Sequence, residues 1–455
     1  MFRSLAVGAV ATALMMSALR EPLLAQTPPS CDSPSPASPA ASLPAAPLAP
    51  ADGTSAPSAA SPSAALLSSL TASSSAAPIA STDIGDVWHW LRHHEGAQDE
   101  QPSPGHHFLV IAPTFGSKPT TGLTLGANTN LAFFRGDPES THISTLTGGF
   151  RVSQKQQVLT GVRFSVFTAN DRWFLQGDNR FSWTSQNTYG LGADTLPTDA
   201  ENIRYDFFRL SETVYRRVEP GLFVGGGVMV NVHTDVQPGT GTVVGWNQSA
   251  YATYTLARGF PLDGQASSGV NVGILYDTRD NAINAQRGWF ANASYRTFFN
   301  GFLGGDSSWQ ELSLDFRTYR QLTHDGRHRV AFWALSDLVT GGTAPYMDLP
   351  STGADGRSAR GYGEGRFRGP HLVYGEVEYR GTLTASGLLG LVAFANTTTV
   401  DDVESGTKLF QGWAPAGGLG FRVLLNKRSR TNLAADYGWG KDGSHGFYLG
   451  IQEAF

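Results

Sequence analysis

Apolar and polar residues alternate along the chain from about residue 104 to the end, with the two-residue period of a β-strand. The clearest segments are 160–167, 289–297, 311–320 and 431–439. Each is roughly ten residues long, which is the length of a tilted strand that crosses a lipid bilayer. Their polar faces carry both signs of charge, which favours a wet or ion-paired interior over the dry core of a soluble sandwich.

Tryptophans recur near the ends of these segments, where the headgroups of a membrane would lie. They are Trp173, Trp183, Trp289, Trp309, Trp413 and Trp439. The pattern therefore predicts an all-β fold, a transmembrane antiparallel β-barrel of about sixteen strands within residues 104–455. Counted back from the last strand, the sixteenth begins near Gly122, and residues 106–115 form either an extra strand or an extension.

Residues 83–95 change to a helical period, because Ile84, Val87, Trp88 and Leu91 fall on one face. Three residues are able to cap the start of this helix: Ser81, Thr82 and Asp83. Two placements are open: an amphipathic helix that rests on the inner leaflet, or a helix that plugs or leans on the periplasmic mouth of the barrel. With the linker that follows it, the helix forms a segment over 83–103.

The chain before this helix predicts export and no folded domain. Residues 1–25 read as a signal peptide, with Arg3 ahead of a short apolar core. Residues 26–82 are almost entirely Pro, Ala and Ser and predict a disordered linker. The single cysteine, Cys31, excludes a disulfide framework. A net charge of −5 supplies no basic surface for nucleic acid.

Motifs of catalysis or metal binding are weak. His89 and His93 lie one helical turn apart, but no third ligand is evident, so we expect a solvated pair and no metal site. The sequence has no Gly-x-Ser-x-Gly, no His-Glu-x-x-His and no phosphate loop. The run His324-Asp325-Gly326 is typical of a polar turn. We therefore expect no enzyme activity and no cofactor.

The stretch 357–380 combines an irregular cationic half with a regular strand. Glycines and a proline exclude regular structure in the first half, which carries Arg357, Arg360, Arg366 and Arg368. In the second half the polar face carries Glu376 and Glu378. In a closed barrel that face points into the lumen, where a loop folded inward finds carboxylates for its arginines.

This stretch resembles the bacterial surface antigen family, the barrel halves of outer-membrane-protein insertases and two-partner-secretion transporters. The family's long sixth loop has an Arg-Gly-Tyr/Phe tip, matched here by Arg360, Gly361 and Tyr362. Gly365 to Arg368 and Glu378 to Arg380 also match. The resemblance implies a loop that folds into the lumen and is held there by Arg360. We call this predicted set the loop-tip lock: Arg360, Gly361, Tyr362, Glu376, Glu378, Asn396 and Asp436.

Other family matches follow in order along the chain: 276–281 with 287–290, 417–422 and 436–440. The last strand implies a sorting signal for the assembly machinery, with one apolar face formed by Phe447, Leu449, Ile451 and Phe455. Glu453 interrupts that face, and nothing in the pattern explains it.

One departure concerns the partner of the loop arginine. The family's Phe-x-Asp-x-Gly motif reads Phe394, Asn396 and Thr398 here, so an amide replaces the carboxylate. We expect Asn396 to accept a hydrogen bond from Arg360, with Glu376 or Asp436 supplying the charge. On that basis Asn396→Asp is expected to tighten the loop.

The resemblance implies a protein of the Gram-negative outer membrane that moves or inserts protein or lipid, and whose partners are outer-membrane lipid and the assembly machinery. Relatives of the insertase type carry folded periplasmic domains where this chain has its linker. The alternative is therefore a passive pore or a structural barrel, which includes the case of a homo-oligomer.

Overall fold

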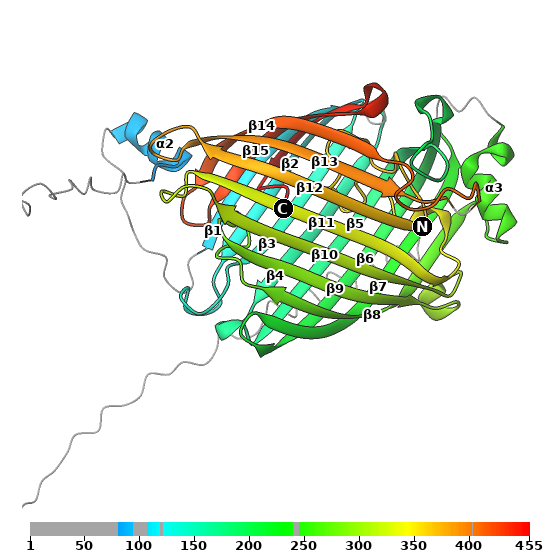
Figure 1. The fold of residues 1–455 in the computed structure, drawn as a ribbon, viewed down its shortest axis with the longest axis horizontal. Coiled ribbons are helices and arrows are strands. Elements are labelled where there is room, and N and C mark those ends of the chain that lie inside the picture. The colour runs from blue at the N-terminus through cyan, green and yellow to red at the C-terminus, as the bar shows by residue number, and fades with distance from the viewer. Residues whose placement is uncertain (1–80, 94–106, 119–121, 240–244, 403) are drawn as a thin grey trace, which may run out of the picture. The chain divides into compact units, whose positions relative to one another are not determined.

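The computed structural model describes residues 81–93, 107–118, 122–239, 245–402 and 404–455 (Figure 1). The predicted signal peptide and linker lie outside these ranges and stay predictions. The described residues belong to a single compact unit. Most of them form strands, as the alternating sequence pattern predicts.

Sixteen strands form one antiparallel sheet in which each strand pairs with its neighbours in sequence order. The strands are β1 (His107–Lys118), β2 (Gly122–Phe133), β3 (Ser144–Ser153), β4 (Val158–Phe167), β5 (Trp173–Thr188), β6 (Glu201–Glu219), β7 (Leu222–Pro238), β8 (Gly264–Asp277), β9 (Gly288–Phe298), β10 (Trp309–Gln321), β11 (His328–Gly342), β12 (His371–Thr382), β13 (Leu389–Val400), β14 (Ala414–Asn426), β15 (Thr431–Gly440) and β16 (His445–Ile451). The end strands β1 and β16 lie in contact, which curls the sheet into a nearly closed barrel. The predicted fold class is confirmed.

The alternation places apolar side chains on the outer face of the barrel and charged ones inside it. Leu109, Ile111, Val272 and Phe421 are 59–64% exposed on outward positions, as lipid-facing residues are. On β12 the outward Val377 alternates with the buried Glu376 and Glu378. Apolar residues of this size on a water-exposed sheet would be costly, so the pattern matches a membrane environment.

The predicted strand count is right, and of the two alternatives for residues 106–115 the separate strand is correct, but the count back to Gly122 is wrong by one. The strand that begins at Gly122 is the second, because His107–Lys118 is a full strand paired with it along its length. Counting back from the C-terminus therefore included one strand too many. Among the described residues between β7 and β8 the regular element is the helix α3 (Ala250–Ala257), capped by the Ser249 side chain.

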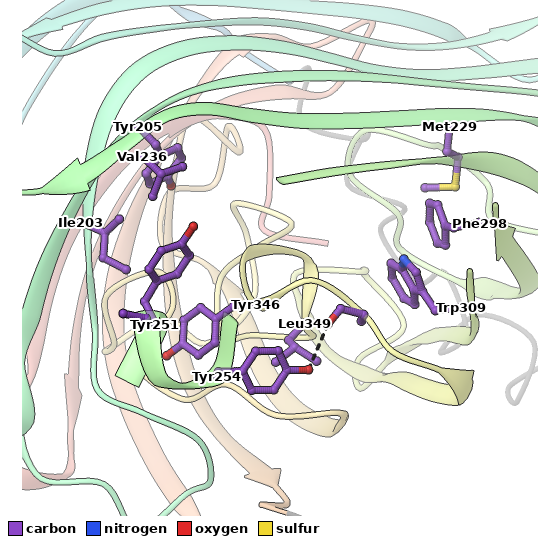
Figure 2. Close-up of a cluster of buried hydrophobic side chains, with 12 residues drawn as sticks. Ile203, Tyr205, Met229, Val236, Tyr251, Tyr254, Phe298, Trp309, Tyr346 and Leu349 are labelled. Atoms are coloured by element: carbon purple, nitrogen blue, oxygen red, sulfur yellow. Dashed lines mark hydrogen bonds between the residues drawn. The ribbon is translucent and has the colours of Figure 1, made fainter. Parts of the chain in front are cut away.

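One end of the barrel carries its longest described loops. The loop between β11 and β12, residues 343–370, folds back against α3, which lies at this end in Figure 1. Tyr346 from the loop contacts Tyr251 and Tyr254 of α3, with ring centroids 5.6 and 5.4 Å apart, and Tyr254 Oη donates to Ala344 O at 2.9 Å. Figure 2 shows these three rings close to one another.

Trp309 does not belong to the predicted tryptophan girdle. It is 1% exposed, stacks on Phe298 with centroids 4.2 Å apart and donates from Nε1 to Ser267 Oγ at 3.1 Å. The register of β10 turns Trp309 inward, where it joins the cluster drawn in Figure 2. The other five predicted girdle tryptophans are exposed: Trp173, Trp183, Trp289, Trp413 and Trp439.

At the opposite end, the connection between β8 and β9, residues 278–287, reaches across the lumen. Ile283 packs with Phe108 of β1 and Ala132 of β2. Asp280 Oδ2 pairs with Arg430 Nη1 at 2.5 Å, in the turn between β14 and β15. The β8–β9 connection therefore contacts the barrel on both sides of the β1–β16 seam.

The helix α2 (Ile84–His93) forms where the sequence predicts one. Asp83 is its cap, because Asp83 Oδ1 accepts from Asp86 N and Asp86 Oδ2 accepts from Asp83 N, both at 3.0 Å. It is fixed to the turn after β14, where Lys427 N donates to Asp83 Oδ2 at 2.9 Å. The side chains of His89 and His93 lie outside the described set. None of the helices described is long and apolar enough to cross a membrane.

Candidate functional site

The tip of loop 343–370 docks on the inner face of the last five strands. The docking begins with Gly361, whose φ of +109° is a conformation that favours glycine. A side chain there would meet Ala416 Cβ at 2.8 Å and the backbone of Trp439 at 3.1 Å. On β15, Gly438 leaves the matching space, because a Cβ there would lie 2.8 Å from Gly361 N. The two backbones approach closely only because both positions are glycine.

Arg360 carries the charge of this contact. Its side chain is 3% exposed, and its guanidinium binds Glu376 and Glu378 of β12 through Nη2. Nη1 donates to Asp436 Oδ2 of β15 at 2.6 Å. The guanidinium also lies over the ring of Phe394 on β13, 3.8 Å from the centroid. Burial alone would lower the pKa of Arg360, but its three carboxylate partners raise it well above the ordinary value, so the group stays charged.

Asn396 has a different contact from the one expected. Its Nδ2 donates to Arg360 O at 3.0 Å, so the amide binds the backbone of the loop tip and not the guanidinium. A carbonyl oxygen needs a donor, which an amide supplies and an ionised carboxylate does not. The charge that the family's aspartate would provide comes from β12 and β15 instead, through Glu376, Glu378 and Asp436.

The backbone of the tip is held by hydroxyl groups from β16 and from the turn that precedes it. Tyr448 Oη of β16 accepts from Gly361 N at 2.9 Å and donates to Tyr362 O at 3.1 Å. Ser444 Oγ donates to Gly361 O at 2.7 Å. The Tyr362 hydroxyl in turn donates to Pro415 O at 2.5 Å and accepts from Lys441 N at 2.9 Å. All seven residues of the predicted loop-tip lock therefore lie together.

Two arginines that the sequence analysis gave no role extend the cluster into a chain of alternating charges. Arg422 Nη1 pairs with Asp436 Oδ1 at 2.5 Å, and its Nε pairs with Glu453 Oε2 at 2.7 Å. Arg380 Nε pairs with Glu378 Oε1 at 2.6 Å. Both arginines lie on polar faces within the quoted family motifs, which is the signal that would have found them.

The end of the chain contradicts the predicted apolar face of the last strand. Phe447, Leu449 and Ile451 follow the outward alternation of β16, but Gln452 adopts a φ of +82° and turns the chain inward. Phe455 is 5% exposed and lies against Trp333 of β11, with centroids 5.1 Å apart. The turn explains the position of Glu453, which Arg422 and Asn432 Nδ2 bind inside the barrel. The sorting role of these four residues stays a prediction.

Among the described residues, no group of three His, Cys, Asp or Glu side chains is placed to hold a metal ion. The site acts by steric fit and by charge. It fixes a loop of 28 residues, 343–370, inside the barrel by the buried Arg360 cluster and several polar contacts. Two further loop arginines are buried: Arg366 donates to Thr195 of the β5–β6 connection, and Arg368 donates to backbone carbonyl groups of the loop itself.

A model of the Omp85 superfamily domain matches residues 226–455. No curated protein sequence matches the chain. The structure of BamA from Haemophilus ducreyi lacking POTRA domains 1–3 is similar to this chain with a TM-score of 0.50 and 12% identity, covering 76% of this chain and 70% of that one.

Two further structures match at a similar level. CdiB from Acinetobacter baumannii has 12% identity and a TM-score of 0.48, and the match covers 76% of this chain and 59% of that one. CdiB from Escherichia coli has 12% identity and a TM-score of 0.48, with coverage of 78% and 64%. At this identity the likeness concerns the fold.

Proposed function

The chain belongs to the Omp85 superfamily and is an outer-membrane barrel, and on this premise we propose that it inserts or translocates protein or lipid at the outer membrane through the seam between β1 and β16. The observation that carries the proposal is how the two sides of the seam are joined. Every two consecutive strands from β1 to β16 are joined by a ladder of backbone hydrogen bonds. The described residues of β1 and β16 are in contact, but no such ladder joins them. Such a seam opens without breaking a continuous backbone ladder.

The β8–β9 connection supports this proposal, because it holds both flanks of the seam by side-chain contacts. Ile283 packs on β1 and β2, and Asp280 pairs with Arg430 beside β15. Arg430 and Asp280 are partly exposed, at 34% and 15%, and an ion pair of this kind contributes only about 0–1 kcal/mol. The proposed opening of the seam therefore breaks this ion pair and the apolar contact of Ile283, and it leaves the ladder intact.

The lumen argues against the passive pore. Residues from both ends line its central cavity, with Ile283 from the β8–β9 connection at one end and Met347 to Asp355 from loop 343–370 at the other. The loop is held by the buried Arg360 cluster. A wide and stable water path would require this loop to leave its site.

Cysteine cross-links across the seam test the proposal. In a Cys31→Ser background, single cysteines at 447–451 of β16 are combined with single cysteines at 107–113 of β1. A matched control joins Val228 and Val270, which are directly paired across the continuous β7–β8 ladder. Each variant is placed in liposomes, and the folding of a urea-unfolded eight-stranded outer-membrane protein and the transbilayer movement of a fluorescent phospholipid are measured.

We expect the unmodified protein to accelerate at least one of the two processes. Oxidation of the seam pairs should abolish that acceleration and a reductant should restore it, while the control pair should have no effect. Acceleration that persists in every cross-linked seam variant would exclude lateral opening. A steady ion conductance without either activity would favour the pore.

A further inference from the structure

The wall formed by β4, β5 and β6 has more arginines than carboxylates. Asp178 is shared by three of them: Arg180 at 2.6 Å, Arg163 at 3.2 Å and Arg209 at 3.9 Å. The three arginine side chains are 18–33% exposed to the lumen. One carboxylate neutralises one cation, so this wall keeps positive charge facing the interior.

Loop 343–370 adds a fourth cation to this wall. Arg357 has no hydrogen bond or ion pair from its guanidinium to any of the residues that the structure describes. Its neighbour Asp355 is engaged in a turn, where Oδ1 accepts from Arg357 N and Ser358 N at 2.8 Å each. Burial, together with the nearby charges of Arg163 and Arg317, lowers the pKa of Arg357 to about 10, which leaves it charged at neutral pH.

The loop docks on the same wall through its carbonyl groups. Arg163 Nη2 donates to Asp355 O at 2.7 Å, and Arg180 Nη1 donates to Ala354 O at 2.8 Å. These bonds place Arg357 beside a cavity of about 400 Å³ that all four arginines line. That volume lies within the range of roughly 300–1,000 Å³ typical of small-molecule sites.

We propose that this part of the cavity is a binding site for a tetrahedral oxyanion, a phosphate or sulfate group, either free or as the phosphate of a lipid headgroup. Among the residues that line this part of the cavity, four cations face three carboxylates: Arg163, Arg180, Arg209 and Arg357 against Asp178, Asp348 and Asp355. Outside the lining, the charge of Glu364, which acts on Arg180, is matched by that of Arg151 beside Arg163. The planar guanidinium presents paired donors that match phosphate oxygens. An anion between Arg357 and the β4–β6 wall supplies the missing negative charge.

Arginines elsewhere in the cavity do not offer this excess. Arg317 binds Asp315 through two bonds of 2.9 and 2.5 Å, and Arg296 binds both oxygens of Glu311 at 3.2 Å. The site is therefore confined to the side where the loop meets β4 and β5. The inference does not rest on the proposed translocation, because it concerns only the interior of the closed barrel.

Titration calorimetry with inorganic phosphate tests the site on the full-length folded protein in detergent at constant ionic strength. We expect binding to the wild-type protein, and an affinity at least about tenfold lower for Arg357→Gln, because charge-assisted hydrogen bonds are lost. Arg357→Lys keeps the charge but loses the paired donors of the guanidinium, so its phosphate affinity should lie between those of the wild type and Arg357→Gln. Arg296→Gln is the matched control, a cavity arginine with its own carboxylate, and should bind phosphate within about twofold of wild type.

Heat-dependent mobility on SDS gels shows whether each variant has folded. The absence of phosphate binding to a folded wild-type protein would overturn the inference, as would equal losses for Arg357→Gln and Arg296→Gln. Native mass spectrometry of protein reconstituted with phosphatidylglycerol distinguishes the source of the phosphate. A phospholipid retained by the wild type and lost from Arg357→Gln identifies the headgroup, whereas calorimetric binding without retained lipid identifies the free anion.

Discussion

The two walls of the lumen that hold loop 343–370 use arginine in opposite ways. On the β12–β16 side, Arg360 is 3% exposed and meets three carboxylates. On the β4–β6 side, three partly exposed arginines share Asp178, and Arg357 has no acidic partner among the described residues. Burial and the ratio of charges therefore decide whether arginine fixes a loop or leaves a site for an anion.

The energetic reason for the difference is desolvation. Removing one partner from a buried ion cluster leaves uncompensated charge and costs about 3–5 kcal/mol, whereas a partly exposed arginine is screened by water and its removal costs little. The comparison predicts that loss of Arg360 on the β12–β16 side releases the loop. Loss of Arg357, whose guanidinium makes no bond to the described residues, should change anion binding with little effect on the loop, whereas Arg163 and Arg180 also hold the loop through Asp355 O and Ala354 O.

Arg360→Ala should have the largest effect. It leaves the carboxylates of Glu376, Glu378 and Asp436 without their shared cation, so we expect loop docking to weaken by about 3–5 kcal/mol. Cleavage by trypsin within 343–370 should rise strongly, while the heat-dependent gel shift persists because the strand ladder does not involve Arg360. The control Arg258→Ala removes a more exposed loop pair with Glu404 and should change neither readout. Unchanged resistance in Arg360→Ala would contradict the lock.

Gly361→Ala should release the tip by a steric route. The new Cβ would lie 2.8 Å from Ala416 Cβ at a φ of +109°, which costs about 1–3 kcal/mol. Gly363→Ala is the matched control two residues away, because a Cβ there meets nothing within 4 Å. Trypsin cleavage of the loop measures both. Equal cleavage of the two variants would show that the close approach to β14 and β15 does not hold the tip.

Asn396→Asp distinguishes the contact that Asn396 makes in the structure from the contact that the family motif implies. The sequence suggested that a carboxylate here tightens the loop. The structure predicts the reverse, because Asn396 Nδ2 donates to Arg360 O and an aspartate would lose that bond, at about 1–2 kcal/mol. The same protease assay should show moderately faster cleavage. Slower cleavage would mean that the guanidinium turns towards position 396.

The smallest predicted effect is a pH dependence on the β4–β6 side. Asp348 lines the cavity and faces Ser267, Asn231, Arg209 and Arg368; burial raises its pKa to about 6 against the opposing effect of these neighbours. Below that pH it loses its negative charge, so sulfate affinity should rise by about twofold to fivefold between pH 7.5 and 5.5. Asp348→Asn should bind sulfate with a weaker dependence on pH than the wild type. A wild-type affinity that falls with decreasing pH would contradict the charge count.

The alternating sequence was sufficient for the fold, because strand periodicity, apolar outward faces and aromatic strand ends each point to a membrane barrel. It misplaced Trp309, which lies at a strand end as a girdle residue does but is turned inward by its register. The same limit applied at the end of the chain. Alternation alone extended the outward face of β16 to Phe455. In the structure, the positive φ of Gln452 and the ion pair between Arg422 and Glu453 direct the end of the chain into the barrel.

The loop-tip residues could be found from motifs, but their pairing could not. Alternation places Glu376, Glu378 and Asp436 on inward faces, yet only the fold shows that one guanidinium reaches all three. The role of Asn396 depended on which atom of Arg360 it meets, and sequence carries no information on that point. The excess of cations on β4–β6 could not be predicted either. It becomes evident only when three arginines that are far apart in the sequence are seen to share one aspartate.

Hydrogen–deuterium exchange of the loop in Arg360→Gln and Arg357→Gln tests most directly whether the two walls differ. Gly361 N donates to Tyr448 Oη and Tyr362 N donates to Ala359 O, so both amides should be protected in the wild type. We predict that Arg360→Gln loses this protection and that Arg357→Gln keeps it while losing phosphate affinity. Equal protection in both variants, or loss of protection in Arg357→Gln alone, would contradict the account.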